Sequence, residues 1–576
     1  MIYFSNFSDQ QIYRIARGDS PVQVTKSPAM RFAEPCVDAK RKRLICVGED
    51  HSKKDREAIN SVVAVSYAED DEGAISTLAD GCDFYSNAKL SGDGEYLAWL
   101  CWNHPNMPWD GTELWLARLD GDGRIATSWK VGGGENESIS TPQWSPEGDL
   151  FFISDRTGWW NLYVIPSERI AQADPSQWQP MAVLEMEAEF TGPQWVFGTS
   201  SYAPLGAGRV LCSINNKGIW SLAVISVDFK TGKAMLEELS TPYTSFAYVR
   251  AGASKAAMCA GSPSEFNAVL EFDLGDRSVK TVKKASELKI DPSYISMPQT
   301  IEFPTEEGLT AQAFFYPPKN KDFCPGDNEL PPLIVKSHGG PTSAASSTLS
   351  LTIQFWTSRG FAVVDVNYGG STGFGKSYRE RLNEKWGVVD VADCRNAAKF
   401  LAAQAKVDRN KLAITGGSAG GYTTLCALTF GDVFKAGASH YGVSDLEALA
   451  KDTHKFESRY LDRLVGPYSE RIETYRQRSP INFPERLNCP VIFLQGSEDK
   501  VVPPGQSEAM VEALKARRLP VAYMLFEGEQ HGFRKAENIA RALEAELYFY
   551  SRVFQFDPAD KIEPVEIFNL MALKPA

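Results

Sequence analysis

One serine stands in a sequence context that favours nucleophilic chemistry. Ser418 lies in the run Gly416-Gly-Ser-Ala-Gly-Gly421, directly after the apolar residues 412–414 and before helix-forming sequence. This order predicts a buried strand, a sharp turn at the serine and a helix, because the small neighbours carry no side chains that would obstruct so tight a turn. The first backbone N–H groups of such a helix can hold a developing oxyanion. We therefore interpret Ser418 as a nucleophile.

A second serine matches the same Gly-x-Ser-x-Gly pattern. Ser371 also follows an apolar strand, residues 361–366, but it leads into Thr372 and the glycines at 373 and 375. Those glycines delay the start of a helix, whereas Ser418 leads directly into one. We interpret Ser371 as a loop residue.

A serine nucleophile needs a base, and the chain has only six histidines. His531 is the one that follows the last predicted strand, which is where an α/β hydrolase places its histidine. The histidines at 51 and 104 lie in the N-terminal half, and those at 440 and 454 precede the best candidate acid. A single histidine can equally be a loop or packing residue. The position of His531 after the last predicted strand selects it as the base.

The candidate acid is Asp499, directly after an apolar strand. Its carboxylate can fix the imidazole tautomer and stabilise the imidazolium ion. Glu498 is the neighbouring alternative, and Asp445 after the preceding strand is a weaker one. The order Ser418, Asp499, His531 is the order that the α/β-hydrolase fold uses.

Backbone donors for an oxyanion complete the pattern. The run Ser337-His-Gly-Gly-Pro341 follows the first interior strand of the C-terminal half. A loop at that position usually supplies one oxyanion-hole amide, and the residue after the nucleophile supplies the other. We assign the N–H groups of Gly340 and Ala419 to this hole; a glycine turn without a role is the alternative.

Length and composition limit the number of domains and the classes of binding partner. A chain of 576 residues is too long for one ordinary core, so two domains are expected. The hydrophobic content of 43% supports packed interiors, and the net charge of −13 argues against nucleic acid or an anionic membrane as a partner. No stretch approaches the roughly 18 apolar residues that span a membrane.

The ten cysteines are scattered, with no CxxC pair and no dense cluster. They are typical of small buried hydrophobic residues in a reducing compartment. The first residues lack a basic segment followed by a long apolar run, so we expect a cytoplasmic protein. The histidines and cysteines show no ligand spacing, and neither a metal nor an organic cofactor is predicted.

The N-terminal half repeats a unit of short strands at intervals close to one propeller blade, roughly 40 to 60 residues. Residues 145–165 contain a full unit: a Ser-Pro-Glu-Gly-Asp turn after the inner strand, then strands over 150–154 and 161–165. A β-sandwich is the alternative, but it would not repeat the same turn at blade-length intervals. Five segments align at this turn and the strand that follows it: residues 42–47, 94–99, 148–153, 208–213 and 255–260.

The first unit of this repeat is shorter than the others. Residues 1–7 align with the second strand of a blade and residues 11–16 with the third, so the inner strand is missing. We expect a propeller of about six to seven blades whose first blade is incomplete. Either the sequence is a truncated or alternatively started form, or another segment supplies the missing edge.

From about residue 293 the pattern changes to a β-hairpin (299–303 and 310–316) followed by alternating strands and helices. This pattern predicts an α/β-hydrolase domain with a mostly parallel sheet. We place a β-propeller domain at residues 1–290 and the α/β-hydrolase catalytic domain at 291–576. The predicted interior strands are 333–336, 362–366, 412–415, 436–439, 491–495 and 522–526, and the clearest helices are 390–405, 506–517 and 536–554.

A propeller followed by a hydrolase domain with these motifs resembles the prolyl oligopeptidase family of serine peptidases, in particular its acylaminoacyl-peptidase and dipeptidyl-aminopeptidase-like branch. The motifs are His338-Gly-Gly-Pro, the run around Ser418, Gly496-Ser-Glu-Asp-Lys-Val-Val-Pro and Gln530-His-Gly-Phe. The resemblance implies a propeller that restricts access to a site between the domains, so that short or unstructured peptides are cleaved.

One motif departs from that family. Its members often show Asn-Tyr-Arg-Gly-Ser-Thr-Gly, whereas this chain has Asn367-Tyr-Gly-Gly-Ser-Thr-Gly373. Any ion pair made by that arginine is absent here. The propeller is also about one blade short of the usual seven. Neither departure involves the serine, the acid or the histidine.

The predicted function is a serine peptidase that hydrolyses short peptides through an acyl-enzyme, as an exopeptidase or oligopeptidase. The alternative is an esterase or amidase acting on a small molecule, because fold does not fix substrate; a binding scaffold with an idle hydrolase domain is a third reading. Residues 453–460 are a candidate lining of the substrate pocket, with a surface helix as the alternative. The predicted partners are short peptides and, as an open possibility, further copies of the chain.

Overall fold

The computed structural model covers residues 1–172, 174–326 and 329–572, and its contacts group the chain into two units. The first consists of Met1–Ala260 and Ala268–Lys284, and the second of Gly261–Asn267 and Ala285–Ala576. The boundary predicted at residues 290 and 291 lies close to this division. The short segment Gly261–Asn267 groups with the second unit, which the sequence does not indicate.

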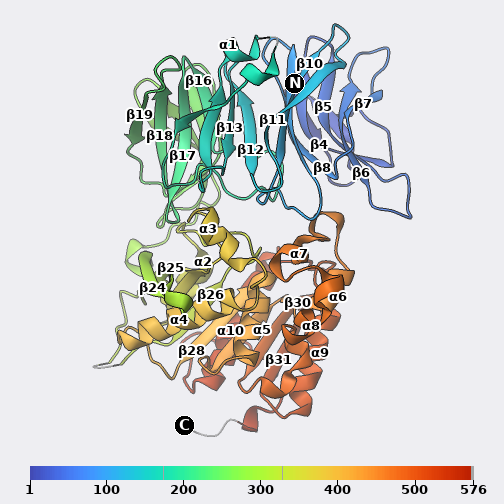
Figure 1. Cartoon of the computed structure of the whole chain (residues 1–576). Helices are drawn as coiled ribbons and strands as arrows, with labels where there is room; N and C mark the ends of the chain where they lie inside the picture. Colours follow the sequence, from blue (N-terminus) through green and yellow to red (C-terminus); the bar gives the residue numbers. More distant parts are fainter. Residues whose placement is uncertain (173, 327–328, 573–576) are drawn as a thin grey trace. The chain divides into compact units, whose positions relative to one another are not determined.

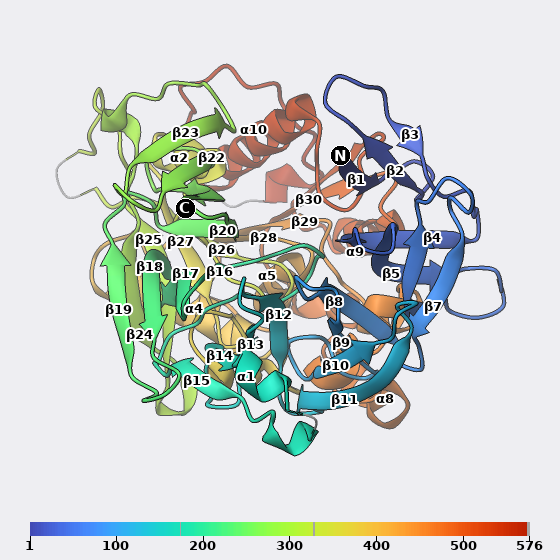
Figure 2. The same ribbon diagram turned by 90° about the horizontal axis from the view of Figure 1, so that it is seen from above.

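The first unit contains six antiparallel sheets, each made of strands that are consecutive in the chain. Figure 2 shows these sheets arranged in a ring around a common axis, so the predicted propeller is confirmed with six blades. Their inner strands β4, β8, β12, β16 and β20 are successive neighbours. The described residues also include one short α-helix in this unit, α1 (Ser167–Ile170), and one 3-10 helix, η1 (Pro175–Gln177).

The strands of the first unit are as follows: β1 (Ile2–Ser5), β2 (Ile12–Ile15) and β3 (Val22–Gln23); β4 (Met30–Asp38), β5 (Arg43–Asp50), β6 (Ile59–Ser66) and β7 (Ile75–Ala79); β8 (Phe84–Leu90), β9 (Tyr96–Trp102), β10 (Glu113–Leu119) and β11 (Ile125–Gly133); β12 (Ile139–Trp144), β13 (Leu150–Ser154), β14 (Asn161–Ile165) and β15 (Met181–Leu184); β16 (Tyr202–Gly206), β17 (Arg209–Asn216), β18 (Ile219–Val227) and β19 (Ala234–Leu239); β20 (Ser245–Ala251), β21 (Lys255–Gly261), β22 (Ala268–Asp273) and β23 (Val279–Lys284).

The first sheet has three strands where the other five have four, so the predicted incomplete blade is confirmed. Its strands follow the order β1-β2-β3, and β1 lies next to the inner strand β4 of the second blade. Among the described residues, no other segment pairs with this sheet.

The repeated turn between the first and second strands of a blade has a common set of hydrogen bonds. In the fourth blade the Ser145 hydroxyl donates to Asp149 Oδ2 at 2.8 Å and accepts from the Asp149 amide at 3.0 Å. In the third blade the Ser91 hydroxyl donates to Asp93 at 2.6 Å and accepts from the Tyr96 amide at 2.9 Å. Serine and aspartate are suited to such turns because their short side chains satisfy nearby backbone groups.

The second unit is built on an eight-stranded sheet in the order β24-β25-β27-β26-β28-β29-β30-β31. The predicted hairpin, β24 (Gln299–Pro304) and β25 (Thr310–Tyr316), forms the antiparallel edge, and the strands from β27 to β31 are parallel to one another. The predicted interior strands are confirmed as β26 (Leu333–Ser337), β27 (Ala362–Asn367), β28 (Leu412–Gly417), β29 (Ala436–His440), β30 (Val491–Gly496) and β31 (Val521–Phe526).

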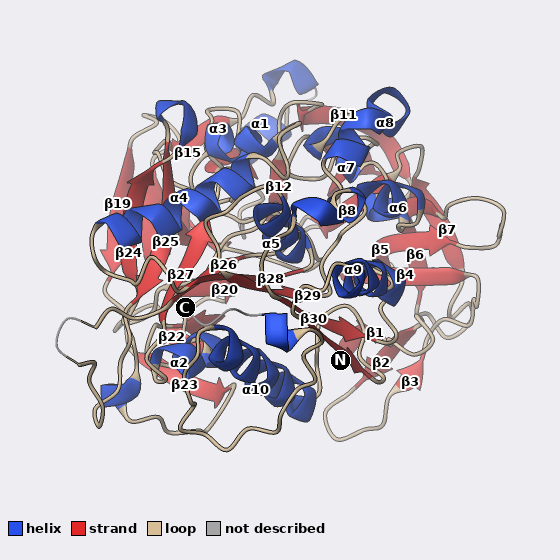
Figure 3. Ribbon diagram, turned by 90° about the horizontal axis from the view of Figure 1, so that it is seen from below, coloured by secondary structure: helices blue, strands red, loops and turns tan. Residues whose placement is uncertain are grey.

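Helices cover both faces of this sheet. Figure 3 shows α4, α5 and α9 on one face and α2 and α10 on the other, and Figure 1 gives the course of the chain through them. Among the described residues, no helix combines the length and the apolar character needed to cross a membrane. The helices are α2 (Leu351–Thr357), α3 (Lys376–Arg379), α4 (Val389–Ala403), α5 (Ala419–Thr429), α6 (Leu446–Lys451), α7 (Tyr460–Leu464), α8 (Tyr468–Gln477), α9 (Pro504–Ala516) and α10 (Ala536–Val553).

A buried ion cluster ties the second blade to the third. Asp38, at the end of β4, is fully buried and accepts from Arg43 Nε at 2.9 Å and from Arg41 at 3.2 Å. Arg43 also donates to the carbonyl oxygen of Gly123 at 2.6 Å, and Arg41 donates to that of Gly94 at 3.0 Å. Both carbonyls belong to turns of the third blade, so one carboxylate holds two cations that join adjacent sheets.

Replacing Asp38 by asparagine should therefore destabilise the first unit. The substitution leaves two buried guanidinium groups without their carboxylate, which costs about 3 kcal/mol. Urea unfolding of the full chain, followed by tryptophan fluorescence, measures the loss. Glu95→Gln is the matched control, because Glu95 pairs with Lys40 where the two side chains are 41% and 54% exposed, and such a pair contributes about 1 kcal/mol or less. Equal effects of the two substitutions would contradict the role of Asp38.

Candidate active site

Ser418 occupies the turn between β28 and α5. Its φ is 56° and its ψ is −122°, a left-handed conformation that side-chain-bearing residues rarely adopt. A Cβ atom on Gly416 would lie 2.4 Å from the carbonyl carbon of Gly420, and one on Gly420 would lie 2.2 Å from the Ser337 carbonyl oxygen. The turn can close only because these two positions are glycine. The predicted strand, sharp turn and helix are all present.

The structure brings the three predicted side chains together. His531 Nε2 lies 2.8 Å from Ser418 Oγ, and His531 Nδ1 lies 2.9 Å from Asp499 Oδ2. A carboxylate only accepts, so Nδ1 carries the proton and Nε2 is free to accept from the serine hydroxyl. This arrangement can transfer the serine proton to the imidazole while the buried carboxylate stabilises the resulting charge.

Further donors hold the Asp499 carboxylate in place. Its Oδ1 accepts from the amides of Val501 and Val502, each at 2.9 Å. Gln495, at the end of β30, donates to Oδ2 at 3.3 Å and is itself held by Ser507 at 2.8 Å. The sequence analysis missed Gln495, since a buried glutamine at a strand end has no signal of its own.

The two alternative acids do not contact His531. The Glu498 side chain is exposed. Asp445 instead caps the N-terminus of α6, where its Oδ1 accepts from the amides of Glu447 at 2.9 Å and Ala448 at 3.1 Å. Among the predicted acids, only Asp499 contacts the imidazole in the described structure.

Two other residues that the sequence analysis missed position the histidine loop. Glu529 is 2% exposed, and its carboxylate accepts from the amides of Arg534 and Lys535, each at 2.9 Å. Tyr441 packs edge-on against His531 with ring centroids 5.1 Å apart. Burial raises the pKa of the Tyr441 hydroxyl, so the ring stays neutral beside the imidazole.

The predicted oxyanion donors come from the loop that follows β26 and from the first residue of α5. Within the described chain, the amides of Gly340 and Ala419 donate to no protein acceptor. The loop that carries Gly340 reaches Ser418, because a Cβ atom on Gly339 would lie 3.7 Å from Ser418 Cβ. Free amides at this position are what an oxyanion requires.

His338 anchors this loop through a stacking contact and hydrogen bonds. It is 8% exposed, stacks on Tyr368 with centroids 4.2 Å apart, and its Nδ1 donates to the Gly339 carbonyl at 2.9 Å. Its Nε2 accepts from the Ser371 hydroxyl at 2.7 Å. Burial lowers the pKa of His338 to about 4, so the ring is neutral at physiological pH. Ser371 is fully buried and holds His338, in agreement with its interpretation as a loop residue.

The glycine that departs from the family motif is closely surrounded. The Gly369 amide donates to Asp393 Oδ2 at 2.7 Å. A Cβ atom at this position would lie 2.7 Å from Val389 Cγ1 and 3.1 Å from Arg381 Cδ. The space that a side chain would need is already filled by these neighbours.

The fold and the site together define a class of protein, a β-propeller unit joined to an α/β-hydrolase unit with a Ser-His-Asp arrangement. A model of the prolyl oligopeptidase family matches residues 347–557. A puromycin-hydrolyzing peptidase from Mycobacterium tuberculosis has a similar solved structure, 39% identical with a TM-score of 0.91 over 98% of this chain and 86% of that chain. The chain therefore belongs to the prolyl oligopeptidase family.

Two curated relatives represent the predicted branch of this family. Dipeptidyl aminopeptidase BIII of Pseudoxanthomonas mexicana is 30% identical over 46% of this chain and 40% of its own length. Acylamino-acid-releasing enzyme of Arabidopsis thaliana is 30% identical over 35% of this chain and 27% of its own length. The chain spans less than half of the length of these curated relatives.

The burial of neutral His338 predicts a pH effect on stability. Its folded pKa, about 4, lies below the ordinary value of 6.5, so the unfolded state binds more protons between these values and stability falls as pH falls from 6.5 to 4. Over that window, the contribution of one such group is up to about 1.4 kcal/mol per pH unit.

Denaturant unfolding of the wild type and of His338→Asn at several pH values from 4.5 to 7 measures this contribution. The difference between the two slopes isolates His338 from other groups that titrate in the same window. We expect a steeper loss of stability in the wild type. Parallel curves would contradict a buried neutral His338.

Proposed function

We propose that this chain is a serine peptidase that hydrolyses short peptides through an acyl-enzyme intermediate. The observation that carries the proposal is the hydrogen-bonded series from Ser418 through His531 to Asp499, with Ser418 Oγ and His531 Nε2 2.8 Å apart. Membership of the prolyl oligopeptidase family supports it.

In the first half of the reaction, His531 Nε2 takes the proton of the Ser418 hydroxyl as the oxygen attacks the substrate carbonyl carbon. The Asp499 carboxylate stabilises the imidazolium that forms, and the amides of Gly340 and Ala419 donate to the oxyanion. His531 then gives its proton to the leaving amine, which departs and leaves the acyl group on Ser418.

In the second half, a water molecule takes the position of the leaving amine. His531 removes one proton from it as the oxygen attacks the acyl carbon, and the same amides hold the second oxyanion. Collapse of this intermediate breaks the ester bond, and the proton on His531 returns to Ser418. The product acid leaves and the starting arrangement is restored.

A small-molecule amide is the second candidate substrate. A relative that is 39% identical is named a puromycin-hydrolyzing peptidase, which supports including puromycin among the compounds tested. The same catalytic groups hydrolyse esters and amides, so the serine chemistry does not separate these substrates.

The ten free thiols support placing this peptidase in a reducing compartment, and we propose the cytoplasm. Assembly into a homo-oligomer stays a prediction.

Replacing Ser418 by alanine should abolish covalent labelling by a fluorophosphonate probe, because the probe reacts with the activated hydroxyl. Hydrolysis of a chromogenic aminoacyl anilide should fall by at least about a thousandfold, since the acyl-enzyme can no longer form. Ser358→Ala, a partly buried serine of the same unit whose hydroxyl donates only to the Phe355 carbonyl, is the control and should keep both signals. Persistent labelling of Ser418→Ala would contradict the assignment.

A substrate panel then separates peptidase from esterase. We expect the wild type to cleave short peptides or puromycin, and Ser418→Ala to cleave neither. Hydrolysis of simple esters alone would replace the peptidase proposal by the esterase alternative.

A further inference from the structure

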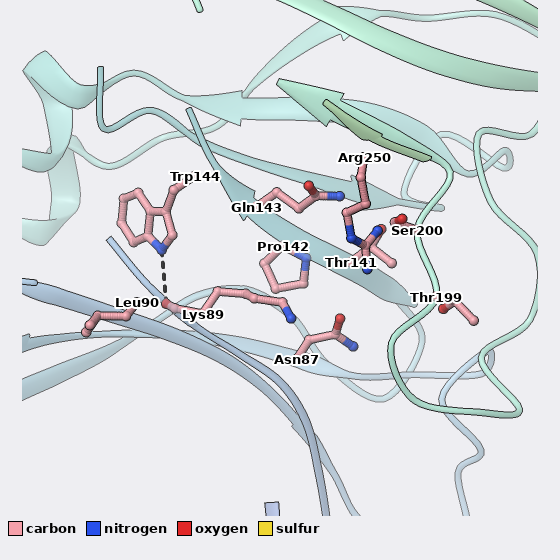
Figure 4. A pocket seen from close by; sticks show the side chains of 10 residues that line it. All are labelled: Asn87, Lys89, Leu90, Thr141, Pro142, Gln143, Trp144, Thr199, Ser200 and Arg250. Atoms are coloured by element: carbon pink, nitrogen blue, oxygen red, sulfur yellow. Dashed lines mark hydrogen bonds between the residues drawn. The ribbon is translucent and has the colours of Figure 1, made fainter. Parts of the chain in front are cut away.

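Polar side chains from the inner strands of the propeller surround a cavity of about 270 Å³. Figure 4 shows Asn87 and Lys89 from β8, Thr141 and Gln143 from β12, and Arg250 from β20 around it. All of its lining residues belong to the first unit. A cavity needs only about 10 to 15 Å³ to hold one water molecule, and typical small-molecule sites begin near about 300 Å³. This cavity therefore has room for a small organic ligand.

A backbone irregularity recurs in the inner strands that form this cavity. Strands β8, β12 and β20 each contain one residue with a left-handed φ: Asn87 at 54°, Thr141 at 47° and Tyr248 at 56°. The register of β8 and of β12 shifts at these residues. This conformation is unfavourable for a β-branched threonine, and strained residues cluster at sites that hold ligands. Two positions after the irregular residues of β8 and β20 come the cations of the cavity, Lys89 and Arg250.

The Thr141 hydroxyl has no partner, although neighbouring polar groups of the cavity are used by the fold. Gln143 Nε2 donates to the Tyr202 carbonyl at 2.8 Å, and Ser200 Oγ donates to the Val249 carbonyl at 2.7 Å. Thr141 is 2% exposed, and its Oγ1 forms no hydrogen bond in the described structure. A buried hydroxyl without a partner is costly, and a ligand that accepts from it would remove that cost.

Positive charge exceeds negative charge at this cavity. Its lining contains two cations, Lys89 and Arg250, and no carboxylate. Lys89 Nζ lies 3.4 Å from the nearby carboxylate of Glu34. The Arg250 guanidinium donates to the carbonyls of Val249 at 3.0 Å and Gly198 at 2.9 Å, which orient it, but it forms no ion pair among the described residues. With Glu34 counted, one positive charge is left without a partner.

We propose that this cavity binds the carboxylate of a short peptide, with Arg250 and Lys89 as its charged partners and the Thr141 hydroxyl as a further donor. A carboxylate matches the planar guanidinium and accepts from several donors at once. One surplus positive charge suits a carboxylate better than a phosphate monoester, which carries nearly two negative charges. Leu90 and Pro142 also line the cavity and supply apolar surface for the rest of the ligand. The choice of a peptide rests on the proposed function, whereas the carboxylate chemistry does not.

Isothermal titration of the full chain carrying Ser418→Ala, which prevents turnover, tests this site. The probes are acetyl-glycyl-leucine, its C-terminal amide, acetate and inorganic phosphate. We expect the peptide to bind at least about tenfold more tightly than its amide, because only the carboxylate pairs with the cations. Arg250→Gln should remove that difference. Arg277→Gln changes an arginine of the same unit that pairs with Glu237, and this control should keep the difference.

Thr141→Val separates a role in binding from a role in folding. Valine keeps the branched Cβ and removes only the hydroxyl, so peptide affinity should fall about three- to tenfold. Because the hydroxyl has no partner in the free protein, the urea midpoint should stay unchanged or rise. A lower midpoint with unchanged peptide affinity would show that the hydroxyl serves the fold, and would overturn its role in the site.

Several results of the titration would contradict the proposal. Equal binding of the peptide and its amide, no binding of either, or an unchanged preference in Arg250→Gln would overturn the site. Acetate or phosphate binding as tightly as the peptide would overturn the choice of a peptide ligand. If Arg250→Gln loses the native tryptophan fluorescence, Lys89→Gln provides the same test with the same expected result.

Fluorophosphonate labelling of the unmodified chain tests the proposed function separately. Labelling without peptide binding in the titration would overturn this site alone. Peptide binding without labelling would overturn the peptidase assignment and leave the carboxylate site in place.

Discussion

The tight turn at Ser418 is the constraint on which the candidate site depends. A left-handed conformation at a serine costs about 1 to 3 kcal/mol, and it persists only where surrounding structure holds it. The parallel strands β26 and β28 do this, because Ser337 pairs with Gly416 and brings the loop of Gly340 to the same sheet edge as the serine. The absence of side chains at Gly416 and Gly420 lets the backbones approach closely enough for this contact.

The polar side chains that hold His531 and the loop of Gly340 are hydrogen-bonded. Asp499 accepts two backbone amides in addition to His531, and Glu529 accepts two more from its own loop. His338 is held neutral by burial and by bonds on both ring nitrogens.

Two groups of charged side chains in the propeller differ in the number of their partners. Asp38 binds two arginines that also donate to carbonyl oxygens of the next blade, so its role is to hold sheets together. Among the described residues, Glu34 is the one carboxylate whose charge acts on both Arg250 and Lys89, and these two side chains line a cavity. The number of available partners therefore separates a structural ion cluster from a candidate binding site.

The sequence predicted the two architectures and the incomplete first blade, and it singled out Ser418 and His531 together with Asp499 as the preferred acid. The three residues could be predicted because each of them follows an apolar strand. Parallel strands place their carboxyl ends at one edge of the sheet, so the three side chains were expected to lie close together. The same local reading identified Ser371 as a loop residue and left Glu498 and Asp445 as alternatives.

The choice among those acids needed the fold, because it depends on which carboxylate reaches the imidazole and which caps a helix. The tertiary structure also identified Gln495, Glu529 and Tyr441, whose contacts have no local sequence signal. From the sequence, residues 453–460 fit either a pocket lining or a surface helix. In the structure, a hydrogen bond from the Thr342 amide to the Tyr460 hydroxyl joins two segments that are 118 residues apart. Contacts across such separations come from packing, which no local pattern encodes.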